Sequence, residues 1–462
     1  MKPHLRGYHR LDLAHEAVAN PESSGISQSF SEPEPKLMMN YFDSVEFLYA
    51  LGNEMRGAKL GLEPMQTVLD ALGNPQRHGR IVHVAGTNGK GSTSAMIASG
   101  LKARGLRTGL YTSPHLQQPT ERIRIDGKPV SSAEFAAAFD VVHRAADKLI
   151  DAGILAVHPS YFEMVTLMAF HIFRDAGVDA AVYEVGLGGR LDATNVVMPE
   201  LTVITPVDYD HEQFLGASIE LIAGEKAGIL KARRPVVIAE QQDAALAVIE
   251  RRARELECPI QRTSELRPSK VAMHELGCRY ELGSLAVECP LAGEHQLQNS
   301  LTAVLALRQM GVGDADIASG ISCVRWPGRL EQVCDSPRII LDGAHNPAGA
   351  RALASYIRRF FSGKRVGLIF GAMRDKSIDE IVTTLFPLAD QLILTAPDMP
   401  RALRPEAMLD FTASTDVLIR RRLPEAIEAI EGVDDRSFGA VCTRCIGFPG
   451  DGLVPEAVSV VM

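Results

Sequence analysis

One short segment constrains this chain more than any other. The apolar run at residues 81–85 (IVHVA) enters a glycine-containing turn, GTNGKG, and a stretch of helical composition follows from Ser92. An apolar run of this length predicts a buried strand. A strand, a glycine loop and a helix N-terminus together form an anion site, because backbone N–H groups, the helix dipole and a lysine ammonium can point at one phosphate. A tight turn that only connects strand and helix is the plainer interpretation.

The loop departs from the usual phosphate-loop pattern, G-x-x-x-x-G-K-[ST], at two positions. Val84 occupies the place of the first glycine, and Gly91 separates Lys90 from Ser92. By itself the loop therefore predicts phosphate binding, and a nucleotide is one ligand that would fit.

Composition limits the class of protein. With 462 residues, 46% of them hydrophobic, the chain can bury two ordinary cores. The formal net charge of −9 argues against a nucleic-acid partner, and no uncharged apolar run is long enough to cross a membrane. The first residues lack an apolar signal core and the seven cysteines are widely spaced, so we expect a cytoplasmic protein. Cys442 and Cys445 have CxxC spacing, for which two ordinary thiols are a simpler interpretation than a redox or zinc pair.

The first 38 residues have the composition of a disordered tail, rich in Ser, Pro and Glu and without periodicity. Met38 and Met39 precede the first amphipathic pattern, at residues 40–55, so an internal start is one interpretation. A transit peptide is the rival, and the acidic residues count against it.

Two α/β series follow along the chain. The strands predicted in the first are residues 81–85, 108–112, 179–185, 201–207 and 235–240, with long helical patterns at 134–150 and 161–177. This alternation predicts a mostly parallel sheet with helices on both faces. The pattern pauses at Pro327 and Gly328. A second, smaller Rossmann-like α/β series then begins, with apolar segments at 338–347, 366–373, 391–397 and 437–443.

Polar groups follow three of the predicted strands. Ser113 and His211 come after two of them, and Glu184 lies near the end of a third. Ligands bind at the carboxyl ends of strands in open parallel sheets, and this set beside a phosphate would suit Mg²⁺, although imidazole is an unusual ligand for it. Ser113 can instead cap a turn, His211 can be a loop histidine, and Glu184 can be a strand-edge carboxylate. An unpaired carboxylate in a buried strand is costly, which favours a metal at Glu184.

Lys226 lies between small residues and an apolar run. It can pair with Glu225 or extend its stem towards solvent. An ammonium close to a bound Mg²⁺ would be repelled by it, so a place for Lys226 near the metal needs a further explanation.

A series of motifs then points to a known family. They occur in the order GTNGKGS, YTSPHL with ERI, YEVGLGGRLDATN, DYDH, GEKAGI, GEHQLQN, PGRLE, LDGAHNP and GAMRDK. In this order they resemble the folylpolyglutamate synthases, especially the bacterial bifunctional dihydrofolate synthase/folylpolyglutamate synthases, within the wider Mur-ligase family of ATP-dependent amide ligases. The resemblance runs from about residue 40 to 400. After the tail at 1–38 that composition predicts, it implies a P-loop-type ATP-binding domain at 39–326 and a glutamate-ligase domain at 327–462.

The resemblance also implies roles for individual residues. The ATP-binding set would be Asn88, Gly89, Lys90, Gly91, Ser92, Asn299, Arg329 and Asp342. The ligands of Mg²⁺, with two ions expected, would be Ser113, Glu184 and His211. Contacts to the pterin would come from Tyr161, Phe162, Glu163, Leu191, Asp192 and Ala193. The residues closest to the chemistry would be Lys90, Lys226, Arg329 and His345. Lys226 would be carbamylated, which turns its positive charge into a negative one, and His345 would help to place glutamate or the acyl phosphate.

The activity implied is the ATP-dependent addition of L-glutamate to dihydropteroate and to reduced folates by a monomer. A monofunctional folylpolyglutamate synthase and a catalytically silent nucleotide-binding relative are the alternatives, and YTSPHL and GRLDATN disfavour a peptidoglycan-type ligase. The family's last strand usually leads into a GSLYLVGE-like stretch, where this chain has VCTRCIGFPGDG. The resemblance therefore does not extend to the last 25 residues.

Overall fold

The computed structural model describes residues 39–52, 61–335, 338–373, 378–396, 402–412, 416–422, 425–426 and 429, and the backbone of strands at 437–441 and 457–461. The predicted tail at 1–38, the segment 442–452 and the Cys442–Cys445 pair lie outside the described residues. Among the residues described, no helix has the length and apolar character needed to span a membrane.

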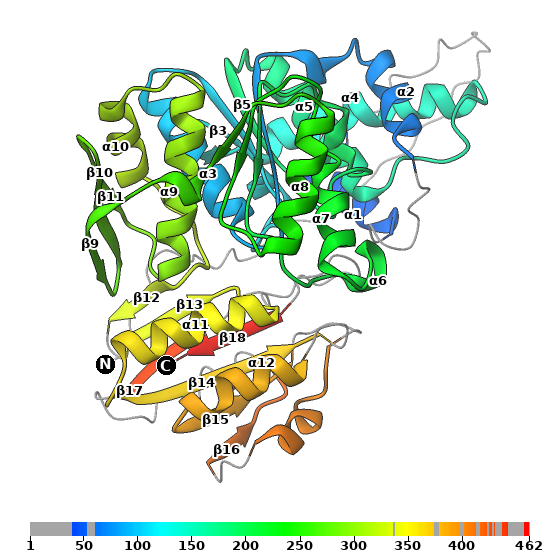
Figure 1. Ribbon diagram of the computed structural model, residues 1–462. Coiled ribbons are helices and arrows are strands. Elements are labelled where there is room, and N and C mark those ends of the chain that lie inside the picture. Colours follow the sequence, from blue (N-terminus) through cyan, green and yellow to red (C-terminus); the bar gives the residue numbers. More distant parts are fainter. Residues whose placement is uncertain are drawn as a thin grey trace, which may run out of the picture.

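An eight-stranded sheet forms the centre of the larger part of the molecule (Figure 1), in the order β4-β3-β2-β5-β1-β6-β7-β8. Its strands are β1 (Arg80–Ala85), β2 (Thr108–Tyr111), β3 (Ile123–Ile125), β4 (Lys128–Pro129), β5 (Ala180–Glu184), β6 (Leu201–Ile204), β7 (Val236–Ile238) and β8 (Ile260–Arg262). The run from β2 to β8 is parallel, whereas β3 and β4 add an antiparallel edge. The five predicted strands are present. The edge strands and β8 were missed because two or three residues are too few to show a period.

Helices cover both faces of this sheet, which confirms the predicted architecture. In β1, Val82 and Val84 point to one face and Ile81 to the other, as the period of two requires. Helices α3 (Lys90–Ala103), α9 (Glu294–Gln309) and α10 (Asp314–Ser322) pack on the first face. The opposite face carries α1 (Tyr41–Ala50), α2 (Glu63–Ala71), α4 (Ser132–Asp151), α5 (Tyr161–Asp175), α7 (Ile219–Ala227) and α8 (Asp243–Glu255).

A small antiparallel sheet, absent from the sequence prediction, lies beside α10 at one side of this part (Figure 1). It consists of β9 (Ser269–His274), β10 (Gly277–Leu282) and β11 (Leu285–Cys289). Cys278 and Tyr280 of β10 are buried and Arg279 between them is exposed. The strands β10 and β11 were missed because buried and exposed residues alternate along them, and β9 because almost all its residues are exposed, whereas the prediction relied on continuous apolar runs.

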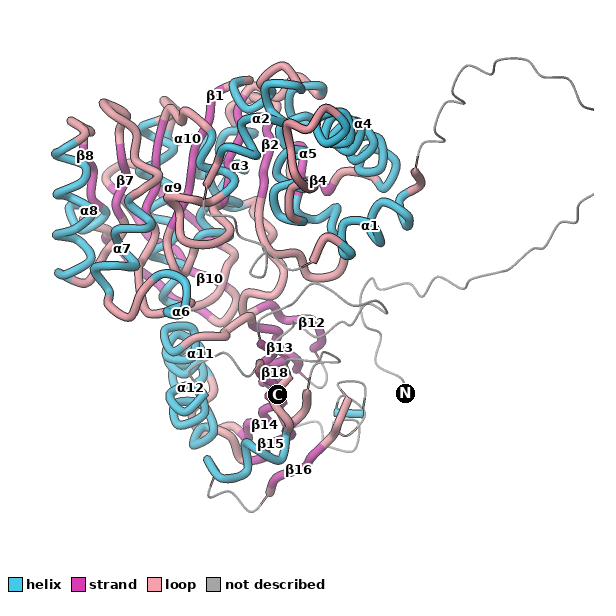
Figure 2. The backbone as a smooth tube through the Cα atoms, turned by 90° about the vertical axis from the view of Figure 1, so that its right-hand side faces the viewer, coloured by secondary structure: helices cyan, strands magenta, loops and turns pink. Residues whose placement is uncertain are grey.

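A third sheet organises the C-terminal part, in the order β12-β13-β17-β18-β14-β15-β16. Its strands are β12 (Glu331–Asp335), β13 (Arg338–Asp342), β14 (Arg365–Ala372), β15 (Gln391–Leu394), β16 (Val417–Ile419), β17 (Ser437–Val441) and β18 (Ala457–Val461). Helices α11 (Pro347–Phe360) and α12 (Ile378–Leu385) lie together on one face of it (Figure 2). The four predicted strands are present, whereas β12, β16 and β18 were not predicted. The antiparallel strands β12 and β18 make this sheet mixed.

The two parts meet where strands of the first sheet end. Asn346, at the N-terminus of α11, donates through Nδ2 to Asn88 Oδ1 and Asp210 Oδ2, both at 3.0 Å. Arg351, also on α11, pairs with Asp208 at 2.8 Å. These contacts hold the C-terminal part against the predicted phosphate loop and the segment after β6.

Candidate functional site

A cleft of about 630 Å³ lies between the two parts. The predicted residues that line it are Asn88, Gly89, Lys90, Gly91, Ser92, Ser113, Glu184, His211, Lys226, Asn299, Arg329, Asp342 and His345. The structure thus brings the loop, the three predicted metal ligands and the residues from beyond the linker to one cavity.

The phosphate loop needs glycine at two positions. Gly86 has φ 149°, and a Cβ there would lie 1.9 Å from Oγ1 of Thr205. Gly89 has φ 82° and caps α3, and a Cβ would lie 2.2 Å from Oδ1 of Asn299. Since both positions combine a left-handed backbone with close contact, any side chain would deform the loop.

The structure explains both departures from the usual pattern. Val84 is a buried residue of β1, in register with Glu184 of β5, so the glycine loop begins only after the strand has ended. Gly91 lies in the first turn of α3, where a Cβ would be 3.0 Å from Nε1 of Trp326. Gly91 therefore allows the indole of Trp326 to lie against the helix N-terminus.

Lys226 is buried on α7, and its Nζ donates to the Gly86 carbonyl at 2.9 Å. Burial, followed by the nearby charge of Lys90, lowers the pKa of Lys226 to about 7, although Asp210 and Asp192 oppose the shift. At neutral pH a substantial fraction of this lysine is therefore the neutral amine, unlike an ordinary exposed lysine.

Glu184, Ser113 and His211 all line the cleft. Glu184 ends β5, and its Oε2 accepts a hydrogen bond from the backbone N–H of Ser113 at 3.3 Å. His211 has a left-handed backbone, φ 52°, and its N–H donates to Oδ1 of Asp210 at 2.9 Å. The carboxylate of Asp210 thus stabilises a conformation that is uncommon outside glycine. A carboxylate, a hydroxyl and an imidazole beside a phosphate loop are a donor set that fits a divalent cation.

The C-terminal part contributes a buried carboxylate and a guanidinium. Asp342 accepts hydrogen bonds from the N–H groups of Leu330 and Ala344, each at 3.0 Å. Burial raises the pKa of Asp342, and the neighbouring Arg329 acts in the opposite direction. His345 lies with Nε2 3.5 Å from Oδ2 of Asp210, so its ring faces the segment after β6.

The six residues predicted to contact a pterin are not among the described residues that line the cleft. Glu163 instead completes the capping box of α5, accepting from the Ser160 N–H at 2.7 Å. Asp192 accepts from the N–H groups of Gly186 and Leu187, both at 2.9 Å, and these two residues do line the cleft. Asp192 therefore acts on the cleft by fixing its backbone.

Of the other four, Tyr161 and Phe162 lie next to residues that line the cleft. The guanidinium of Arg122, a cleft residue, is 5.1 Å from the ring centre of Tyr161. A Cβ at Gly186 would lie 2.5 Å from the ring of Phe162. Leu191 and Ala193 flank Asp192, and Ala193 is buried.

Sequence reasoning missed several residues that hold the site together. Gln296 donates to Oγ of Ser92 at 3.2 Å and accepts from Nδ2 of Asn299 at 3.0 Å, which fixes α9 against α3. Asp210 and Asn346 form the bridge between the two parts. These residues stand inside the quoted motifs GEHQLQN, DYDH and LDGAHNP. The motifs were the available signal, but a sequence does not show which distant residues pair.

Comparison with known families agrees with this geometry. The Mur ligase middle domain matches residues 84–307, and the Mur ligase glutamate ligase domain matches residues 328–442. Two α/β parts around a phosphate-loop cleft, with these matches, define the class of protein: a Mur-type ligase.

The relatives narrow this class. The dihydrofolate synthase/folylpolyglutamate synthase of Mycobacterium tuberculosis is 39% identical over 375 residues, covering 75% of this chain and 76% of the relative. The corresponding Escherichia coli protein is 34% identical over 355 residues, covering 76% and 81%. The chain belongs to the dihydrofolate synthase/folylpolyglutamate synthase family.

Solved structures show the same relationship. Mycobacterium tuberculosis folylpolyglutamate synthase complexed with ADP and AMPPCP superposes with a TM-score of 0.79 at 34% identity, covering 87% of this chain and 96% of that one. Escherichia coli FolC in complex with DHPP and ADP gives a TM-score of 0.77 at 29% identity, covering 88% and 95%. The family and the predicted fold are therefore both confirmed.

Proposed function

We propose that this protein uses ATP to activate the carboxylate of a pterin-containing acid and then joins it to L-glutamate, with dihydropteroate and reduced folates as acceptors. The observation that carries the proposal is that the phosphate loop lines the same cleft as Arg329 and Asp342 of the C-terminal part. Relatives that share this fold bear the names of both synthases, and one structure contains DHPP with ADP.

In the proposed reaction, residues of this chain would neutralise charge on the phosphates and hold them in position. A carboxylate is a poor acylating agent, so the γ-phosphoryl group is first transferred to it, and the amine of glutamate attacks the resulting acyl phosphate. The loop N–H groups and Lys90 would hold the phosphates, and Arg329 would neutralise charge on the transferring group. The tetrahedral intermediate then collapses to an amide and phosphate. No covalent enzyme nucleophile is needed.

Ser113, Glu184 and His211 are the residues that would hold Mg²⁺, with two ions expected. A bound divalent cation would neutralise phosphate oxygens and orient them. The buried position of Glu184 supports this role, because a carboxylate in a parallel strand is stabilised by a cation.

Carbamylation of Lys226 is part of the proposal. The neutral amine adds to CO₂ and loses a proton, which gives a carbamate with a negative charge. The lowered pKa of Lys226 supports this step, since only the unprotonated amine reacts. The carbamate would offer oxygen in the direction of the phosphate loop, where Lys226 now contacts Gly86.

The proposed position of the pterin follows from the residues that lie next to the lining of the cleft. We place the pterin near Tyr161, Phe162 and Leu191. The first two lie next to the cleft residues Arg122 and Gly186, respectively. Asp192 would then position the Gly186–Leu187 backbone, to which it is hydrogen-bonded. Glu163 would position the start of α5 through its cap, and Ala193 would act by close packing. His345 would help to place glutamate or the acyl phosphate.

The remaining parts of the proposal concern organisation. We propose a domain boundary near residue 327, between α10 and β12, which agrees with the separate matches at 84–307 and 328–442. We also propose a monomer that works in the cytoplasm.

The test is release of phosphate by the purified protein with ATP, Mg²⁺ and glutamate, with dihydropteroate or tetrahydrofolate as acceptor. We expect release only when an acceptor is present, and a product heavier by one glutamate with either acceptor. Activity with tetrahydrofolate alone would assign a monofunctional folylpolyglutamate synthase. Silence with both acceptors, while ATP still binds, would assign a nucleotide-binding relative without activity.

A further inference from the structure

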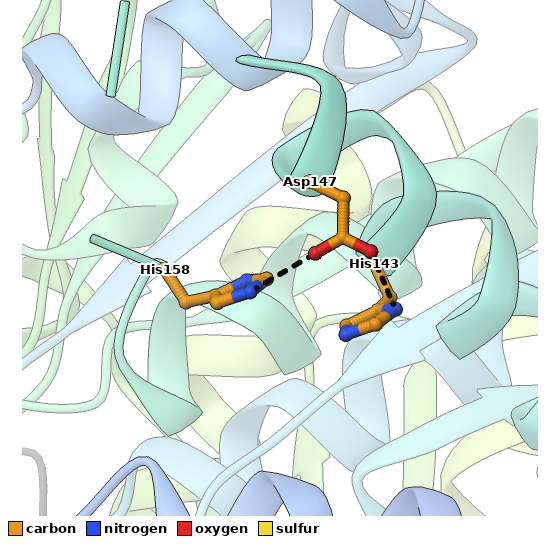
Figure 3. A group of neighbouring side chains, drawn as sticks. All are labelled: His143, Asp147 and His158. Carbon is orange, nitrogen blue, oxygen red and sulfur yellow. Dashed lines mark ion pairs between the residues drawn. The ribbon is translucent and has the colours of Figure 1, made fainter. Parts of the chain in front are cut away.

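A second polar cluster lies away from the cleft. His143 and Asp147 are on α4, one turn apart, and His158 is in the segment that leads to α5. In Figure 3 the carboxylate of Asp147 reaches both imidazole rings, with one oxygen towards each. Nδ1 of His143 is 3.6 Å from Oδ2, and Nε2 of His158 is 3.2 Å from Oδ1.

The rings are held in place by aromatic neighbours. The two imidazoles are parallel within 2°, with centres 5.1 Å apart. Phe47 of α1 meets both rings edge-on, at 4.6 Å from His143 and 5.3 Å from His158. Phe139 stacks on His143 at 5.1 Å. Because four rings from three segments fix one another, the nitrogen atoms keep their direction towards Asp147.

We propose that His143, Asp147 and His158 bind a divalent transition metal, with Zn²⁺ as the best match. The one ligand atom that each residue offers lies within 4.8 Å of the other two. Nδ1 of His143 lies 3.6 Å from Oδ2 of Asp147 and Nε2 of His158 3.2 Å from Oδ1, so each imidazole has its own carboxylate oxygen close by. Both distances are close to the roughly 3.4 Å between neighbouring ligand atoms of a tetrahedral site with bonds of about 2.1 Å. Two imidazoles and one carboxylate are ligands that suit Zn²⁺ better than Mg²⁺.

The side chains are accessible enough for an ion to enter. His143, Asp147 and His158 are exposed by 11%, 25% and 21% of their side-chain surface. The ion would link the C-terminal end of α4 to the segment before α5. It would thereby hold in place the N-terminus of α5, which begins with Tyr161. A fourth position would remain for water or for an external ligand.

A matched control exists on the neighbouring helix. His171 and Asp175 have the same i,i+4 spacing on α5, with Nε2 of His171 3.3 Å from Oδ2 of Asp175. They do not belong to a group of three such ligands among the residues that the structure describes. The pair on α4 has a third ligand, His158, which the pair on α5 lacks among these described residues. We therefore expect only the α4 cluster to bind Zn²⁺ tightly.

The experiment is a titration of the chelator-treated full chain with Zn²⁺ by calorimetry, and with Co²⁺ by visible absorption, in excess Mg²⁺ and without nucleotide. The variants are His143→Gln, His158→Gln and Asp147→Asn, with His171→Gln as the control. We expect wild type and His171→Gln to bind one more equivalent than the three cluster variants. The affinity lost in these variants should be on the order of 10-fold or more, since loss of outer partners alone costs about 10–100-fold.

The effect of Zn²⁺ on thermal stability is a further readout. Zn²⁺ should raise the thermal unfolding midpoint of wild type and His171→Gln and leave that of Asp147→Asn unchanged, because binding stabilises only the folded site. If His158→Gln is not folded by circular dichroism, Asp147→Asn supplies the comparison. The proposal is overturned if wild type and Asp147→Asn bind the same number of Zn²⁺ ions, or if wild type gains no stability with Zn²⁺.

Discussion

Lys90 and Lys226 donate hydrogen bonds to the same backbone oxygen. Nζ of Lys90 is 3.1 Å and Nζ of Lys226 2.9 Å from the carbonyl oxygen of Gly86. Lys90 also donates to Thr87 O at 3.1 Å, and it begins α3, whereas Lys226 lies on α7. The turn before the helix therefore brings two lysines together, and burial together with Lys90 lowers the pKa of the more deeply buried one.

The first prediction concerns stability and pH. Lys226 has a pKa of about 7 in the folded chain against 10.5 as the ordinary value, so between these pH values the unfolded state binds more protons. The free energy of unfolding of wild type should therefore rise with pH relative to Lys226→Met, by up to about 1.4 kcal/mol per unit. Below pH 7 Lys226 is protonated in both the folded and the unfolded state, so the free energy of unfolding is lowered by the full cost of burying the ammonium.

Urea unfolding of both proteins at pH 7, 8 and 9, without nucleotide, measures this difference. The exposed Lys102 of α3 provides a control, and Lys102→Met should follow the wild-type dependence. Parallel curves for wild type and Lys226→Met would contradict the shifted pKa.

The second prediction concerns turnover. Lys226→Ala should reduce kcat on the order of 100-fold or more, as loss of a single preorganised electrostatic group does. Short carboxylates such as acetate should restore part of the rate if a carbamate is the active form. Lys226→Arg retains a positive charge and cannot form a carbamate, so its rate should stay low with acetate or without it. Full activity of Lys226→Arg would exclude the carbamate.

The third prediction concerns Mg²⁺. Glu184→Gln keeps the size of the side chain and removes its charge, so the Mg²⁺ concentration for half-maximal activity should rise by about 10-fold or more, as a lost charged ligand implies. Glu240 lines the same cleft but is exposed, and Glu240→Gln should keep the wild-type Mg²⁺ dependence. An unchanged Mg²⁺ curve for Glu184→Gln would remove Glu184 from the set of ligands.

The fourth prediction uses the single tryptophan of the chain. Trp326 lines the cleft next to Gly91, and the guanidinium of Arg124 is 5.4 Å from its ring centre. Binding of ATP at the loop should change its environment, so emission should shift as ATP is added. Lys90→Met, which weakens phosphate binding, should move this titration to higher ATP concentrations. Emission that does not respond to ATP, while calorimetry shows binding, would place the nucleotide away from Trp326.

Much of the fold and the site could be predicted, because the relevant signals are local. The run at 81–85 and the glycines after it predict a strand and a loop, and the structure has both. Val84 and Gly91, which looked like defects, have local explanations that only the structure supplies. The first is inside the strand, and the second allows Trp326 to approach. For Asp192 the sequence identifies the motif but not the partners, because its hydrogen bonds to Gly186 and Leu187 depend on the conformation of the loop.

Three of the strands that were not predicted, β10, β11 and β12, share a physical cause. In β12 most residues are half-buried, and β10 and β11 alternate between buried and exposed positions, so none of the three presents a continuous apolar run. The strand β16 is apolar but only three residues long. Pairings such as Asn346 with Asp210 depend on how two α/β units pack, which no local period encodes.

The last prediction concerns that contact between the two parts. Asn346 has two separable roles: its Oδ1 accepts from the Gly349 N–H at 2.9 Å and caps α11, while its Nδ2 bridges Asn88 and Asp210. Asn346→Ser keeps a good cap and removes the bridge, whereas Asn346→Ala removes both. Loss of an N-cap costs about 1 kcal/mol, so Asn346→Ala should be less stable than Asn346→Ser by roughly that amount.

The same two variants, Asn346→Ser and Asn346→Ala, should differ in stability but not in turnover. If the bridge aligns the C-terminal part with the phosphate loop, both variants should lose a similar factor in kcat/KM. A factor on the order of 10 is expected, since a hydrogen bond to a charged group contributes about 1.5–3 kcal/mol. Urea unfolding and the phosphate-release assay measure the two effects on the same samples. Wild-type turnover in Asn346→Ser would show that the bridge only joins the parts and that closure over the nucleotide does not depend on it.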